Sequence, residues 1–167
     1  MKIGIIGLGL IGGSLGRAII SRTKDEVYAL DISKKAMADS KLLNAYHFEL
    51  NKSNIGEIDM LILSLYPNAL ESALEEYCPL LKDGCLVMDC CGNKRRVVKQ
   101  MSKLSKKYPA LDFVSAHPMA GREFSGVNHS TATLFDRASM ILVPVKSHIK
   151  RIASVKEYFL SFLKSSK

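Results

Sequence analysis

Apolar residues follow two alternating patterns along the chain: short continuous runs, and longer stretches with helical spacing. Short apolar runs that are rich in β-branched side chains are typical of buried strands. The run at 59–63 is apolar after its first residue, which favours a strand covered on both faces. Strands are predicted over residues 2–6, 26–30, 59–63, 85–88, 112–115 and 139–143, with a short extended piece at 45–48.

The stretches between these runs predict helices. Ser33 is a good N-cap and Pro67 suits a first helical position. In the last helix, Ile152, Phe159 and Phe162 recur at near-helical spacing, so we expect them to face the core. The helices are predicted over residues 10–21, from 34 onward, 67–78, 95–105 and 148–163, and the longest irregular stretch is 116–136.

Strands that alternate with helices predict an α/β fold, a doubly wound and mostly parallel sheet with helices on both faces. No Pro-, Gly- or Ser-rich linker divides the chain, so we expect residues 1–167 to form a single domain.

Residues 1–16 have some features of a short signal peptide, but their glycines favour a strand, a glycine turn and a helix start. No window of about 18 apolar residues occurs, which excludes a membrane-spanning helix.

The four cysteines are Cys78, Cys85, Cys90 and Cys91. They form no C-x-x-C pair and no cluster with zinc spacing, so we expect no metal site. Unpaired thiols of this kind are typical of reduced cysteines in a cytoplasmic protein.

The net charge of +8 raises the question of nucleic-acid binding. Seven basic residues and no acidic residue lie between Lys94 and Lys107. Val97, Val98, Met101 and Leu104 form an apolar stripe opposite them, however, and no aromatic residue interrupts the basic run. A solvated helix face is therefore favoured over a nucleic-acid surface, and the positive field suits anionic cofactors and carboxylate substrates.

A glycine fingerprint follows the first predicted strand and opens the first helix. In such a motif Gly7 permits the tight turn, Gly9 lets the backbone approach a pyrophosphate, and Gly12 permits close helix packing. The segment consists of Gly7, Leu8, Gly9, Leu10, Ile11 and Gly12. This context indicates a Rossmann-type dinucleotide site.

Asp31 ends the second predicted strand, where an acid binds the adenine ribose hydroxyls. A carboxylate there repels a 2′-phosphate, so NAD is favoured over NADP. Lys34 and Lys35 follow closely and leave NADP as a lesser possibility.

Two further segments follow predicted strands, where open α/β sheets bind ligands. Ser64, Leu65 and Tyr66 follow one strand, and Asp89 and Gly92 follow the next. We expect both segments to contribute to the cofactor site.

The run from His117 to Gly126 reads His-Pro-Met-Ala-Gly-Arg-Glu-Phe-Ser-Gly and places a histidine at the start of the long irregular stretch. Together with residues 7–16 and the spacing of Asp89 and Lys94, it resembles the prephenate and arogenate dehydrogenases. The resemblance extends over essentially the whole chain. The histidine motif is specific to that family, whereas the glycine motif is shared by many oxidoreductases.

The resemblance implies an NAD-dependent oxidative decarboxylation of prephenate or arogenate, small cyclohexadienols that carry a ring carboxylate. His117 would accept a hydrogen bond from the ring hydroxyl while hydride leaves the carbinol carbon. A neutral imidazole suits this role because its pKa lies near neutrality. Lys94 matches the motif's lysine and is carried over as a catalytic residue.

Two features depart from the family. Where the family carries a serine beside the histidine, this chain has Gly92, and Cys91, Asn93 or a water molecule are open as replacements. The family also continues into a C-terminal helical domain that forms the dimer and binds the substrate carboxylate. A fragment, a truncated product and a short natural form are all open.

Two other functions are weighed against this one. Another Rossmann oxidoreductase, such as a β-hydroxyacid dehydrogenase relative, does not carry the histidine run. A non-catalytic NAD-binding module is kept open by the chain length and by Gly92.

Overall fold

The computed structural model describes all residues except 122, 148 and 164–167, and the side chains of residues 162 and 163. Its centre is one sheet in the order β3-β2-β1-β4-β5-β6-β7. Neighbouring strands are parallel, except that β7 runs antiparallel to β6. The strands are β1 (Lys2–Ile6), β2 (Glu26–Leu30), β3 (Phe48–Glu49), β4 (Met60–Leu63), β5 (Leu86–Asp89), β6 (Asp112–Pro118) and β7 (Met140–Lys146).

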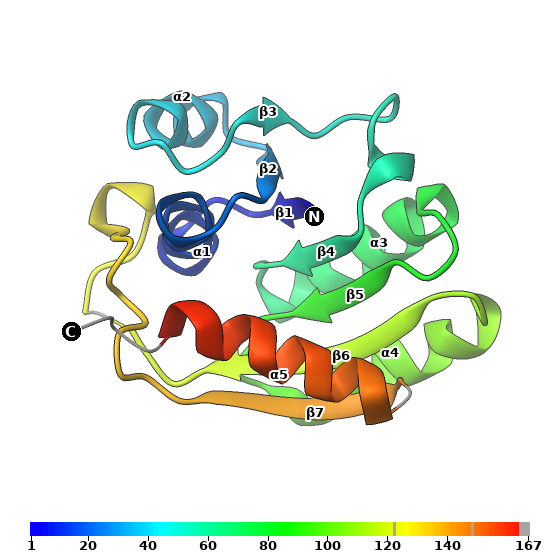
Figure 1. Ribbon diagram of the computed structural model, residues 1–167. Coiled ribbons are helices and arrows are strands. Elements are labelled where there is room, and N and C mark those ends of the chain that lie inside the picture. The colour runs from blue at the N-terminus through cyan, green and yellow to red at the C-terminus, as the bar shows by residue number, and fades with distance from the viewer. Residues whose placement is uncertain (122, 148, 164–167) are drawn as a thin grey trace.

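Helices cover both faces of this sheet, as predicted (Figure 1). Helices α1 and α5 pack on one face, and α3 and α4 on the other. The predicted N-cap is confirmed, because the Ser33 hydroxyl accepts the Ala36 N–H at 3.2 Å. The helices are α1 (Leu10–Arg22), α2 (Lys34–Leu42), α3 (Pro67–Tyr77), α4 (Lys94–Lys107) and α5 (Ile149–Leu163), and none of those described is long and apolar enough to cross a bilayer.

The strands supply side chains to two separate cores because successive residues point to opposite faces. Ile62 joins the core under α1 and α5, which includes Leu15 and Phe159. Its neighbours Leu61 and Leu63 join the core under α3 and α4. The predicted strand covered on both faces is confirmed over Met60–Leu63, and Asp59 lies just before it.

The basic helix is amphipathic, as its sequence indicates. Val97, Met101 and Leu104 are buried in the core under α3 and α4, while Val98 is half-buried. Apart from Lys94, the basic residues of this helix are exposed, so the fold itself accounts for the apolar stripe of the basic run.

The region around β6 and β7 differs from the predictions. We predict strands that end at 115 and 143, but β6 continues to Pro118 and β7 to Lys146. The antiparallel pairing of the two strands extends the ladder, with His117 opposite Ile141. Pro144 lies within β7 rather than ending it, which an edge strand tolerates because one side needs no ladder hydrogen bond.

Two smaller expectations also change. The extended piece predicted at 45–48 forms a strand only at Phe48–Glu49. In α5, Phe159 is buried as predicted and Val155 joins it, while Ile152 is half-buried. His148 and the side chain of Phe162 lie outside the described residues.

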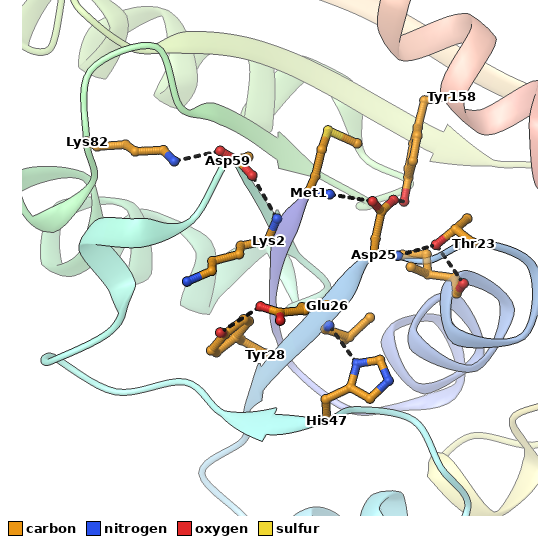
Figure 2. A network of polar contacts seen from close by, with 12 residues as sticks. Met1, Lys2, Thr23, Asp25, Glu26, Tyr28, His47, Asp59, Lys82 and Tyr158 are labelled. Atoms are coloured by element: carbon orange, nitrogen blue, oxygen red, sulfur yellow. Dashed lines mark hydrogen bonds and ion pairs between the residues drawn. The ribbon is translucent and has the colours of Figure 1, made fainter.

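Polar contacts tie the first strands together at the amino end of the sheet (Figure 2). Asp25 accepts hydrogen bonds from the amino group of Met1 and from the Tyr158 hydroxyl, which anchors α5 at this edge. Asp59 accepts the backbone N–H of Lys2 at 2.7 Å and the Lys82 ammonium at 2.6 Å. Burial raises the pKa of Asp59, but these two donors outweigh it, so the pKa lies below its ordinary value.

The Asp59→Asn substitution should lower the free energy of unfolding at pH 7 by about 0.5–1 kcal/mol, because the side chain is partly exposed and only the charge is removed. A carboxyl with a depressed pKa stabilises the fold above its unfolded-state value and loses that effect as acid protonates it. The difference from wild type should therefore hold at neutral pH and shrink as the pH falls below 3.8, the ordinary pKa of the group, toward the lower folded-state pKa.

Urea denaturation of both proteins from pH 7 to pH 3 measures this difference. The Asp83→Asn variant, changed at a nearby carboxyl on the turn before β5, is the control and should match wild type throughout. A pH-independent difference for Asp59→Asn would show that the carboxylate charge is not responsible.

Candidate functional site

The glycine turn joins β1 to α1 at the carboxyl edge of the sheet. Gly7 adopts a φ of +94°, and a Cβ there would lie 2.3 Å from the Ser64 carbonyl oxygen. A Cβ on Gly12 would lie 1.9 Å from the Gly7 carbonyl oxygen. Both positions therefore exclude any larger residue, and the turn and the start of α1 are held in close contact.

Gly9 has a different role from these two glycines. A Cβ built on it would meet nothing within 4 Å, so the chain is open at this point. Gly9 is also the N-cap of α1 and supplies no capping side chain, which leaves the first N–H groups of the helix directed outward. Leu10 and Ile11 begin the helix here, and such a terminus is suited to a pyrophosphate.

Asp31 lies beside this turn at the end of β2. One carboxylate oxygen accepts the Leu8 N–H at 2.7 Å, and the other accepts the Ser33 N–H at 2.8 Å. Each oxygen of an ionised carboxylate has a second lone pair. Asp31 therefore fits a ribose hydroxyl while it also holds the glycine turn in place.

The segment after β4 lies next to the glycine turn. The Ser64 N–H donates to the Ile6 carbonyl at 2.8 Å, and Ser64 contacts both Gly7 and Gly12. Leu65 is half-buried, and Tyr66 is 82% exposed at the start of α3. The structure thus brings Ser64 to the site, whereas the side chain of Tyr66 projects into solvent.

His117 lies at the end of β6 rather than in a loop, and its side chain is half-buried. A Cβ on Gly92 would lie 3.6 Å from Cε1 and 4.0 Å from Nε2 of the imidazole. The predicted residues His117 and Gly92 are therefore neighbours, and a side chain at position 92 would touch the ring. The buried Nδ1 atom has no hydrogen-bond partner within the described parts of the chain.

Asp89 and Lys94 lie next to the backbone that leads into His117. Asp89 is fully buried, and its Oδ2 atom accepts the Lys94 ammonium at 2.7 Å and the Cys91 N–H at 2.8 Å. Lys94 also donates to the Ser115 hydroxyl at 2.9 Å and to the Ala116 carbonyl at 2.5 Å. The predictions did not include Ser115 or Ala116, because nothing in the sequence links these residues of β6 to a lysine 21 and 22 positions earlier.

Cys91 is engaged away from the histidine. Its thiol donates to the Leu65 carbonyl at 3.0 Å, and its side chain packs in the core under α3 and α4. Burial raises the pKa of the Cys91 thiol to about 11, so it stays protonated at neutral pH. Cys91, one of the open replacements for the family's serine, thus donates its thiol to Leu65.

The long segment after β6 folds back over α1. The Thr131 N–H donates to the Ser14 hydroxyl at 3.0 Å, and Arg17 donates to the Ser130 carbonyl at 2.5 Å. The ring of His129 stacks on Phe124 with centroids 5.1 Å apart. The segment is therefore anchored to the same helix whose first turn forms the candidate cofactor site.

Among the residues that the structure describes, no group of three or more His, Cys, Asp or Glu side chains is placed to hold a metal ion. The four cysteines are free thiols.

Comparison with known proteins identifies relatives of this fold and site. The prephenate dehydrogenase nucleotide-binding domain family matches residues 15–163. A prephenate dehydrogenase from Lactococcus lactis is 30% identical over 161 residues, covering 90% of this chain and 43% of the relative. The chain thus spans less than half the length of that relative.

Solved structures show the same fold. The arogenate dehydrogenase of Synechocystis superposes with a TM-score of 0.88 at 22% identity, covering 99% of this chain and 58% of that one. The prephenate dehydrogenase of Aquifex aeolicus, in complex with hydroxyphenyl propionate and NAD⁺, has a TM-score of 0.82 at 23% identity and covers 100% and 59%. Because the family match runs from the first half of α1 to the end of α5, the chain belongs to the prephenate dehydrogenase nucleotide-binding domain family.

Proposed function

We propose that this chain is the single NAD-binding domain of a prephenate or arogenate dehydrogenase and carries the catalytic histidine of that enzyme. The observation that carries the proposal is the position of His117, which lies at the carboxyl edge of the sheet against the side-chain-free Gly92. Membership in the family and the open glycine turn support the same function.

The cofactor side of the proposal rests on Asp31 and the start of α1. The outward N–H groups of the helix would hold the pyrophosphate, with Gly9 allowing close approach. Asp31 would accept hydrogen bonds from the adenine ribose, which favours NAD over NADP. The segment of Ser64, Leu65 and Tyr66 would border the cofactor, and Gly92 would lie at its nicotinamide end. Asp89 would support the turn before Gly92 by accepting the Cys91 N–H.

When bound, NAD supplies the hydride acceptor, and the protein supplies position and a proton acceptor. His117 would accept the hydrogen bond of the substrate's ring hydroxyl through a neutral ring nitrogen. That contact stabilises the carbonyl that develops as hydride leaves, and carboxylate loss as CO₂ then makes the ring aromatic. The product would be 4-hydroxyphenylpyruvate or tyrosine.

The relatives are about twice as long as this chain, and the remainder would provide the dimer contacts and the arginine that binds the substrate carboxylate. Orientation of the reacting carbon depends on such contacts. We therefore expect residues 1–167, assayed by themselves, to bind NAD but to turn over prephenate slowly. The free thiols support a cytoplasmic location, and the amphipathic α4 supports a solvated basic face rather than a nucleic-acid partner.

The His117→Asn substitution should lower the rate of NADH formation from prephenate and NAD by about 10²- to 10⁴-fold, because the proton acceptor is lost. The affinity for NAD should stay within about twofold of wild type. Absorbance of NADH and an NAD titration by calorimetry measure the two quantities. His129→Asn, which alters the ring stacked on Phe124, is the matched control and should keep the wild-type rate.

This experiment also separates the competing functions. Equal loss of NAD affinity and rate would indicate that His117 maintains the structure of the site. NAD binding with no turnover in wild type would indicate a non-catalytic module or an incomplete catalyst. Turnover of a β-hydroxyacid in place of prephenate would identify another Rossmann oxidoreductase.

The Asp31→Asn substitution should weaken NAD binding by about tenfold, since one carboxylate acceptor becomes a donor facing a backbone N–H. The ratio of NAD to NADP affinity should fall, because the charge that repels a 2′-phosphate is removed. Calorimetric titration with both dinucleotides tests this, with Asp39→Asn on α2 as the control. An unchanged ratio would show that Asp31 does not face the ribose.

A further inference from the structure

Lys94 makes a set of hydrogen bonds near the site that the proposed function does not explain. An ammonium group has three N–H donors. All three have acceptors within 3 Å, namely Asp89 Oδ2, Ser115 Oγ and the Ala116 carbonyl oxygen. The side chain is 21% exposed and its charge is neutralised by the fully buried Asp89. Lys94 therefore has no donor to spare for a substrate.

The acceptors come from the ends of two adjacent strands. Asp89 ends β5 and is paired in register with Ser115 of β6. The Ala116 carbonyl belongs to the peptide bond that leads directly into His117. Lys94, the first residue of α4, thus joins the helix start, the end of β5 and the backbone at His117.

The imidazole of His117 has an unpartnered buried nitrogen beside this backbone. A functional histidine is usually oriented by a hydrogen bond at its second ring nitrogen. Here Nδ1 is buried and has no such partner within the described residues. On its other edge the ring faces Gly92, which has no side chain to hold it. The described residues therefore give the ring no orienting hydrogen bond at Nδ1, while the backbone that leads into it is held by Lys94 at the Ala116 carbonyl.

We propose that Lys94 is a positioning residue that orients His117 through the Ala116 carbonyl, with Asp89 as its buried counter-charge. This assignment rests on the proposed function of His117 and replaces the expectation that Lys94 itself acts in catalysis. Lys94 contacts neither the substrate nor the cofactor, and Asp89 acts through the ammonium and the Cys91 N–H.

The test uses the 167-residue chain with its histidine rings labelled with ¹³C at Cε1. The Lys94→Met variant leaves Asp89 as an unpaired buried charge, so the double variant Lys94→Met/Asp89→Asn removes both charges and protects folding. Lys99→Met, at an exposed position of the same helix, is the matched control. His117→Asn assigns the ring signal of His117.

In the double variant, the His117 ring signal should shift or broaden, while the signals of His47 and His129 stay in place. The affinity for NAD is measured beside it, because Asp89 also supports the loop that would border the nicotinamide end of the cofactor. The kcat for prephenate should fall by about 10- to 100-fold with KM nearly unchanged, as expected when a reacting group is misplaced. The Lys99→Met control should match wild type in all three measurements.

A His117 signal that is identical in the double variant and in Lys99→Met would overturn the proposal. A raised KM with unchanged kcat would also overturn it, because Lys94 would then contact the substrate directly. The ring signal requires neither cofactor nor substrate. A wild-type chain that binds no NAD would therefore contradict the proposed function, while the signal would still decide the role of Lys94.

Discussion

Helix α1 approaches the rest of the fold so closely that no side chain fits at two of its contacts. A Cβ on Gly12 would lie 1.9 Å from the Gly7 carbonyl oxygen, and one on Gly16 would lie 2.0 Å from that of Ala45. This close packing places the first turn of the helix above the carboxyl ends of the central strands. The amide groups of that turn and the carboxylate of Asp31 meet there because the helix cannot lie farther away.

A second contact fixes the part of the sheet's carboxyl edge that carries His117. Lys94 and Asp89 form a buried pair that also includes the backbone of β6. A buried ion pair stabilises little when compared with apolar side chains, but it restricts geometry, because each partner left alone would be an uncompensated charge. In this fold the restricted group is the peptide before His117. The two halves of the edge thus use different means, close packing of glycines and a buried charge pair, to fix their polar groups.

The position of His117 shows where sequence reasoning reached its limit. The motif identifies the residue, but the irregular composition after it predicts a loop. The structure places it on β6 because pairing with β7, which begins more than twenty residues later, extends the strand. Long-range pairing of this kind leaves no periodic signal near the histidine itself.

The sequence by itself determined the order of strands and helices, the two-sided burial of the sheet, the glycine turn and the acid at the end of β2. These features depend on local spacing, on the absence of a Cβ, or on helix capping, all of which are read from neighbouring residues. Tertiary structure alone decided that Lys94 donates to Ser115 and Ala116, that Cys91 bonds to Leu65, and that Gly92 faces the imidazole. Each of these contacts joins residues more than twenty positions apart. The sheet order and the packing of α4 bring these residues together. The spacing of residues along the chain gives no signal of such long-range contacts.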